Sequence, residues 1–218
     1  DDPGHVTWGW KDSLLDKKAV FYARVLKHRN TFISLDLLPA FYALSPNYGS
    51  PDEDYLIDYE SGRLTAEARS VFEAILLNGP LDTIALRKAA HLTSRSSDGP
   101  FNKALNVLQG TFRILPVGIS QAGAWKYAFI YDLVNRQYPW IIEKSHPLGE
   151  WEARRAILHS YIRSVGAASS PEIARCLGWS PALVDRSARK LLDNSELVRC
   201  TVEGKSPIHL SLPPSCLV

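Results

Sequence analysis

The sequence predicts an α+β fold that is mainly α with small β-hairpins. Two observations lead to this prediction. In the last third of the chain, three segments with helical spacing precede two strand-like runs that a turn joins. The middle third has the same order of segments. Three helices followed by a β-hairpin is the order of a winged helix, so we predict tandem winged helix-turn-helix modules preceded by a helical N-terminal segment.

The last third shows the pattern most completely. Apolar residues recur at helical spacing in "WEARRAILHSYIRSV", residues 151–165. Ser169 or Ser170, followed by a proline, gives the start signal of a second helix, and Ser180, also followed by a proline, that of a third. The runs "ELVRCTV" and "PIHLSL" flank "EGKS", which has the turn chemistry of a hairpin.

The middle third repeats this plan. The segment 79–92 aligns with 166–179 at a constant offset of 87 residues, and 104–117 aligns with the region from Ala188 at an offset of 84. The first copy therefore has three extra residues in its polar turn, "TSRSSDG". Its hairpin is expected in "FRILPVGIS" and "WKYAFIYDL". Agreement of caps, apolar positions and hairpins favours a repeat.

The first 65 residues differ from both copies. We expect an amphipathic helix in "DSLLDKKAVFYARVLKH", a brief strand in "TFIS" and a helix in "LDLLPAFYAL". A loop and an acidic helix that Gly62 ends complete the segment. The acids Asp52, Glu53 and Asp54 could suggest a metal site, but acids at a helix start also favour its dipole, and we expect no metal.

Charge divides the chain in the same places. Residues 1–65 carry 7 Lys/Arg against 10 Asp/Glu, residues 66–149 carry 9 against 6, and residues 150–218 carry 9 against 7. We therefore predict an N-terminal segment (1–65), a first module (66–149) and a second module (150–218). The positive charge of both modules weakly favours nucleic acid as the partner.

Composition excludes several other classes. The hydrophobic fraction of 45% and charged fraction of 22% are those of a globular protein, and no apolar run approaches the ~18 residues of a membrane span. Three scattered cysteines favour neither disulfides nor zinc, so we expect a reducing cytoplasm. The sequence has no Met and opens on "DDPGHVTW", which suggests either a piece of a longer protein or a sequence without its methionines.

In a helix-turn-helix protein, the outward side of the second helix meets DNA. In the second module, helical spacing gives the following outward set: Arg186, Ser187, Arg189 and Lys190. Arginine suits guanine edges and phosphates. The alternative is a solvated face on which Arg186 and Lys190 pair with Asp185 and Asp193.

In the first module the corresponding outward residues are Asn102, Lys103 and Asn106, preceded by Arg95 in the extended turn. The hairpins add wing cations beside flat rings, which suit a DNA backbone or a base face. These hairpin candidates are Trp125, Lys126 and Lys205. Trp125 and its neighbour Tyr127 could equally be cross-strand sheet residues.

Catalytic motifs are sparse. The sequence has no G-x-S-x-G, P-loop, H-E-x-x-H or paired-cysteine motif, and no cofactor is expected. The most function-like patch is "TWGWKDSLLDKK", in which Trp8, Trp10, Lys11 and Asp12 bring together two flat rings, a cation and a carboxylate. Such a set can stack on a base and handle a proton. The alternative is an aromatic staple at a helix start with Asp12 as its cap.

Three segments together resemble proteins related to the AlkZ/YcaQ DNA glycosylases. They are "WGWKDSLLDKK…FYARVLKHRNTFISLDLLPAFYAL", the hairpin with "LPVG…AGAWKYAFIYDL", and "RRAILHSYIRSVGAASSPEIARCLGWS". The resemblance spans most of the chain, and the WxWKD and AGxWKYAF segments are its most specific parts. It implies tandem winged helices and base excision from double-stranded DNA that carries an alkylated or crosslinked base.

The sequence departs from this family's pattern in one respect. The family's glycosylases use a Gln-x-Gln pair, whereas the glutamines here are Gln109, Gln121 and Gln137. No catalytic residue therefore transfers from the resemblance. The hypotheses are a repair-related DNA-binding protein, a non-enzymatic DNA-binding regulator, and modules that serve protein–protein contacts.

Overall fold

A computed structural model of the chain describes residues 13–15, 17–47, 49–123, 126–204 and 208–214. About half of the structure is helical, and its strands form small antiparallel sheets, so the α+β class is confirmed. Within these described ranges, no helix is long and apolar enough to cross a membrane.

The middle of the chain forms one unit of helices around a three-stranded sheet. Its elements are α4 (Ala66–Asn78), β3 (Leu81–Asp82), α5 (Thr83–Ala89), the 3₁₀ turn η1 (Arg95–Ser97), α6 (Asp98–Gly110), β4 (Ile114–Ser120) and β5 (Ala128–Leu133). The sheet order β3-β5-β4 places the short strand beside the last one. Helix α4 begins after Thr65, whose hydroxyl accepts a hydrogen bond from the Ala68 N–H at 3.2 Å.

The last third has the same element order. Its elements are α9 (Glu150–Val165), β6 (Ala167–Ala168), α10 (Ser170–Leu177), α11 (Pro181–Asp193), β7 (Val198–Cys200) and β8 (His209–Ser211), with sheet order β6-β8-β7. Ser169 is the cap of α10, because its N–H donates to Glu172 at 2.8 Å in a capping box. The Ser180 hydroxyl caps α11 by accepting from the Leu183 N–H at 3.3 Å.

The helix expected in residues 12–28 is wrong over most of its length. Residues Phe21–Leu26 form strand β1, which pairs antiparallel with β2 (Arg29–Ile33). The turn between them holds Lys27 and His28 at φ of 51° and 58°, the left-handed region that a two-residue hairpin turn needs. The apolar residues of "FYARVL" fit the spacing of a helix as well as that of a strand. Only the pairing with "RNTFI" decides between the two.

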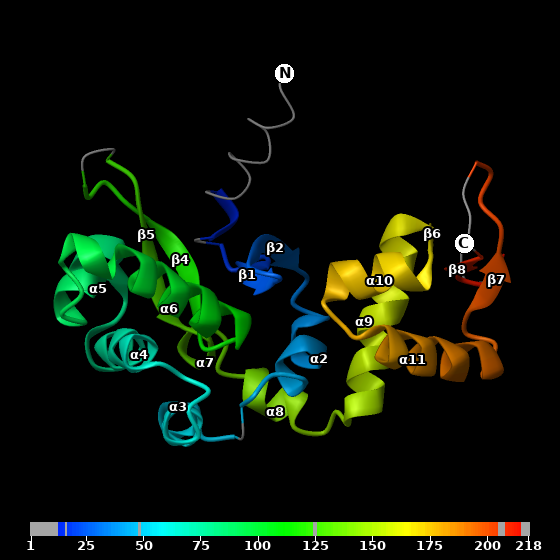
Figure 1. Cartoon of the computed structure of the whole chain (residues 1–218), viewed down its shortest axis with the longest axis horizontal. Coiled ribbons are helices and arrows are strands. Elements are labelled where there is room, and N and C mark those ends of the chain that lie inside the picture. Colours follow the sequence, from blue (N-terminus) through cyan, green and yellow to red (C-terminus); the bar gives the residue numbers. More distant parts are fainter. Residues whose placement is uncertain (1–12, 16, 48, 124–125, 205–207, 215–218) are drawn as a thin grey trace.

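The N-terminal elements pack against both the middle and the last third of the chain. The remaining helices are α2 (Leu38–Ala43), α3 (Pro51–Glu60), α7 (Val134–Gln137) and α8 (Ile141–Ser145). Phe21 and Ile33 of the hairpin share a buried cluster with Phe112, Leu115 and Ile141. The β1–β2 hairpin and α2 lie between the two units (Figure 1). Ala40 of α2 is buried in a second cluster with residues of the last third, and Leu26 of the hairpin packs against that cluster. The hairpin and α2 therefore contact the cores of both units.

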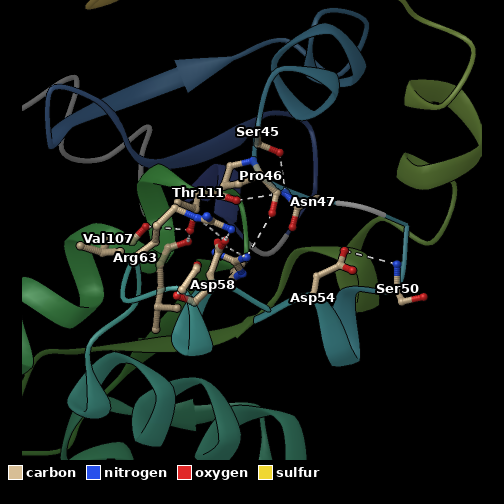
Figure 2. Close-up of polar contacts among 12 residues, drawn as sticks. Ser45, Pro46, Asn47, Ser50, Asp54, Asp58, Arg63, Val107 and Thr111 are labelled. Atoms are coloured by element: carbon tan, nitrogen blue, oxygen red, sulfur yellow. Dashed lines mark hydrogen bonds and ion pairs between the residues drawn. The ribbon is translucent and has the colours of Figure 1, made fainter. Parts of the chain in front are cut away.

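A buried ion pair between Asp58 of α3 and Arg113 connects α3 to the turn between α6 and β4. Arg113 donates from Nη2 to the Asp58 carboxylate at 2.8 Å and to the Pro46 carbonyl at 3.1 Å. Both charged side chains are almost fully enclosed, with 2% of Arg113 and 4% of Asp58 exposed. Arg63 donates from Nε to the other Asp58 oxygen at 2.7 Å. Figure 2 shows Asp58 and Arg63 beside the loop that carries Pro46.

Candidate nucleic-acid interface

The first half of α6 presents the side chains expected from the sequence. Asn102 and Lys103 are exposed, and Arg95 is exposed at the start of η1. Asn102 donates back to the Asp98 carbonyl at 2.9 Å. In the part of the chain that the structure describes, neither Arg95 nor Lys103 has an ion-pair partner. Both charges are therefore available to an anionic ligand.

Asn106, on the second half of α6, is already engaged within the protein. Its side-chain oxygen accepts a hydrogen bond from Nη1 of Arg24 at 3.1 Å. The Arg24 N–H donates to the Gln109 side chain at 3.1 Å. Strand β1 therefore covers this half of α6, and Asn106 does not point freely outward as predicted. Sequence reasoning missed Arg24 because it expected a helix there.

A buried tyrosine of β5, in the core of the first unit, is affected by the charge of Arg24. Burial raises the pKa of Tyr131 to about 12, and the nearby charge of Arg24 partly opposes this rise. The Tyr131 hydroxyl is therefore neutral at physiological pH and can donate a hydrogen bond. Arg24 and Asn106 therefore meet where the hairpin joins the first unit, and the charge of Arg24 reaches the Tyr131 hydroxyl.

The β4–β5 hairpin places Lys126 at an exposed position with φ of 48°. Tyr127 is 37% exposed, and its ring meets Phe129 edge-on with centroids 5.7 Å apart. This contact runs along one arm of the hairpin and is not the cross-strand pair of the structural alternative. Among the described residues, Lys126 has no ion-pair partner. The predicted residue Trp125 lies outside the described residues.

The outward set predicted for α11 is partly wrong. Ser187 is only 3% exposed, because the helix turns it toward the core beside Val184 and Ala188. Arg186 lies 3.9 Å from the Glu150 carboxylate, and Nζ of Lys190 stands 4.0 Å above the Trp151 ring. The partners of these two cations therefore come from α9 and not from the acids of α11.

Arg189 lies in a cleft between α11 and the β7–β8 sheet. The cleft has a volume of about 240 Å³ and is also lined by Arg199, Ser170 and Asp185. Both arginines are exposed, and over the described ranges neither has an ion-pair partner. Arg199 was missed, although its outward place between Val198 and Cys200 follows from strand alternation. Two guanidinium groups on one cleft suit a phosphate.

The remaining predictions concern catalysis and metal. Trp8, Trp10, Lys11, Asp12 and Lys205 all lie outside the described residues. Among the residues that are described, no group of three or more His, Cys, Asp and Glu side chains could hold a metal ion. The acids Asp52, Glu53 and Asp54 occupy the first turn of α3, the position that favours the helix dipole.

Two of the three glutamines have structural hydrogen bonds. Gln109 is buried and donates to the Leu105 carbonyl at 3.1 Å while it accepts from Arg24. Gln137 donates to the buried carboxylate of Asp132. These hydrogen bonds give both glutamine side chains a structural role.

The structure defines an α+β protein of two units with one element order, each carrying exposed cations without a partner among the described residues. The chain belongs to the AlkZ-related family, whose model matches residues 1–178. This family relates the protein to glycosylase-like DNA repair and indicates DNA as its substrate or partner. No curated protein and no solved structure matches the chain.

Proposed function

We propose that this protein binds double-stranded DNA in repair, through two winged-helix modules at 66–149 and 150–218 preceded by the segment 1–65. The element order of each unit, helix–strand–helix–helix–strand–strand, supports this proposal. So does the order of each sheet, in which the first short strand lies beside the last. In such modules α6 and α11 are the helices that approach the major groove.

One observation carries the proposal most strongly. Lys103, Arg189 and Arg199 are exposed on the corresponding helices and sheet, and none has an ion-pair partner in the described ranges. Free cations release counterions from DNA when they meet phosphates, which drives binding at low salt. Arg186 and Lys190 contribute less, because Glu150 and Trp151 already contact them. Membership of the AlkZ-related family supports DNA as the anion.

The first prediction concerns salt. The logarithm of affinity for a duplex should fall as the logarithm of salt concentration rises. Lys103→Ala should make this dependence less steep, with a slope smaller in magnitude by about 0.9, the share of one phosphate contact. Lys144→Ala removes a cation that stands over the Trp140 ring and should leave the slope unchanged. Fluorescence anisotropy across a salt series measures both. A slope near zero for the unaltered protein would overturn DNA binding and favour protein–protein contacts.

The chemical step is a separate proposal within the same function. We infer that the protein acts on a damaged base and that the segment Trp8–Asp12 contributes to this step, since it brings flat rings and a carboxylate into five positions. The alternative to this chemical step is a DNA-binding regulator without catalysis.

The free thiols Cys176 and Cys200 suit the reducing cytoplasm expected from the sequence.

Base release distinguishes the enzyme from the regulator. A duplex with an alkylated base should lose that base to the unaltered protein, and Asp12→Asn should slow the release by at least about a hundredfold, the usual contribution of an acid–base group. The variant should bind the same duplex as tightly as before. Release is measured by strand cleavage at the abasic site. No release by the unaltered protein, with equal affinity for damaged and intact DNA, would leave the regulator as the function.

A further inference from the structure

An apolar cleft lies where the β1–β2 hairpin meets the last third of the chain. It has a volume of about 220 Å³ and is bounded by the hairpin, α2, α9 and α10. This is less than the roughly 300–1,000 Å³ of a pocket for a drug-sized molecule, so it suits one small ring system. None of its described lining residues is charged.

Aromatic rings and hydroxyl groups share this lining. Phe32 from β2 is 47% exposed at the cleft, and Phe41 and Tyr161 line it from α2 and α9. Ser160 and Ser164 add hydroxyl groups. Burial raises the pKa of the Tyr161 hydroxyl, which therefore remains a neutral group. A flat ring with polar edges could stack and form hydrogen bonds in the same place.

Three exposed cations adjoin lining residues of this cleft in the sequence. They are Lys27, Arg163 and Arg175, and the one acid that adjoins the lining in the same way is Asp36. The charges of Arg175 and of Glu172 both reach the Tyr161 hydroxyl, where they act on its pKa in opposite directions. Arg163 also lines a neighbouring hollow that shares Ser160 with the cleft. An apolar interior with Lys27 and Arg163 nearby suits a ligand with a flat ring and an anionic attachment.

The hairpin turn places one of these cations beside the second unit. Lys27 and His28 hold positive φ angles in a turn where Asn-Gly is the favoured pair. The Lys27 side chain lies against Gly178 in the turn between α10 and α11. The tip is therefore held beside the second unit.

We propose that this cleft receives one unpaired nucleobase of DNA, with Lys27 and Arg163 holding the flanking phosphates. The proposal rests on the DNA-binding function above and adds to it a site for the base itself. Stacking on Phe32 and Tyr161 would bind any of the four bases, because every base has a flat face. The serine hydroxyls can meet the polar edge of the base.

Cys176 provides a direct test, because it is exposed, lines the cleft and carries a free thiol. The full chain with Cys200→Ser and Cys216→Ser is treated with a maleimide under saturating DNA. A duplex with one base opposite an abasic site should slow labelling of Cys176 by roughly tenfold relative to a fully paired duplex. Equal labelling with the two duplexes would overturn the proposal, because the duplex alone would then shield the thiol.

Variants test the lining independently of the thiol. Phe32→Ala and the cleft-filling Ser164→Trp should both abolish the preference for the duplex with the unpaired base, measured as the ratio of two dissociation constants. Leu77→Ala, which removes a 78% exposed apolar side chain of α4, should retain that preference. Lys27→Asn keeps a residue suited to the turn and should weaken the preference by removing the charge. A preference that survives both cleft variants would also overturn the proposal.

Failure of the site and failure of the function give different results. If the protein binds paired duplex with a clear salt slope but shows neither thiol protection nor base preference, the cleft assignment is wrong and DNA binding stands. If neither duplex binds, both proposals are overturned. Thermal unfolding of each variant confirms that a lost preference does not reflect a lost fold.

Discussion

Asp58→Asn is expected to lower the free energy of unfolding by about 3–5 kcal/mol, because it leaves Arg113 buried without its counter-charge. The Arg113 side chain is only 2% exposed, and its Nε and Nη1 already have no hydrogen-bond partner in the structure. The remaining hydrogen bond to the Pro46 carbonyl cannot compensate a full charge. Urea unfolding followed by circular dichroism measures the change.

Arg63→Ala provides the matched control for this pair. Arg63 binds the same carboxylate, but 53% of its side chain is exposed, so its loss should cost no more than about 1 kcal/mol. The double variant Asp58→Asn with Arg113→Met should recover much of the loss, since no buried charge remains. Equal losses for Asp58→Asn and Arg63→Ala would show that burial of Arg113 does not determine the energy of the cluster.

Replacing both Arg189 and Arg199 by Ala is expected to have the largest effect on DNA affinity. The two guanidinium groups share one cleft and have no ion-pair partner among the described residues. Each phosphate contact that is lost should reduce the magnitude of the slope of log affinity against log salt by about 0.9. For the double variant, the magnitude should therefore fall by nearly twice that value. Affinity at low salt should fall, and unfolding free energy should change little because both side chains are exposed.

The control for this prediction has the same change in net charge. Arg69→Ala with Lys144→Ala removes two cations that are already engaged, by Glu73 at 2.8 Å and by the Trp140 ring at 4.7 Å. Its salt slope should match that of the unaltered protein. If both double variants lost the same slope, only net charge would matter, and the cleft between α11 and its sheet would not be a specific phosphate site.

Local signals in the sequence predicted most helices well. Ser169 and Ser180 each cap a helix, as their positions before a proline and an amphipathic run predicted, because a capping side chain satisfies nearby backbone groups whatever lies farther away. The repeated order of elements followed from the same signals. Lys103 and Arg189 were assigned to exposed helix faces because apolar residues on the opposite faces fix the rotation of an amphipathic helix.

Other features of the site depend on contacts between distant residues. Asn106 is engaged because Arg24, 82 residues earlier, reaches it from a strand that the sequence presented as a helix. The cleft with Phe32 and Tyr161 exists only because the hairpin packs beside α9 and α10.

The sequence by itself determined the repeated helices, their caps and the cations at exposed helix positions, because interactions within a few turns of one helix establish them. The tertiary structure decided the β1–β2 hairpin, the Arg113–Asp58 pair and the apolar cleft. These depend on which segments meet, and a strand or a buried charge is stable only when its partner is in place.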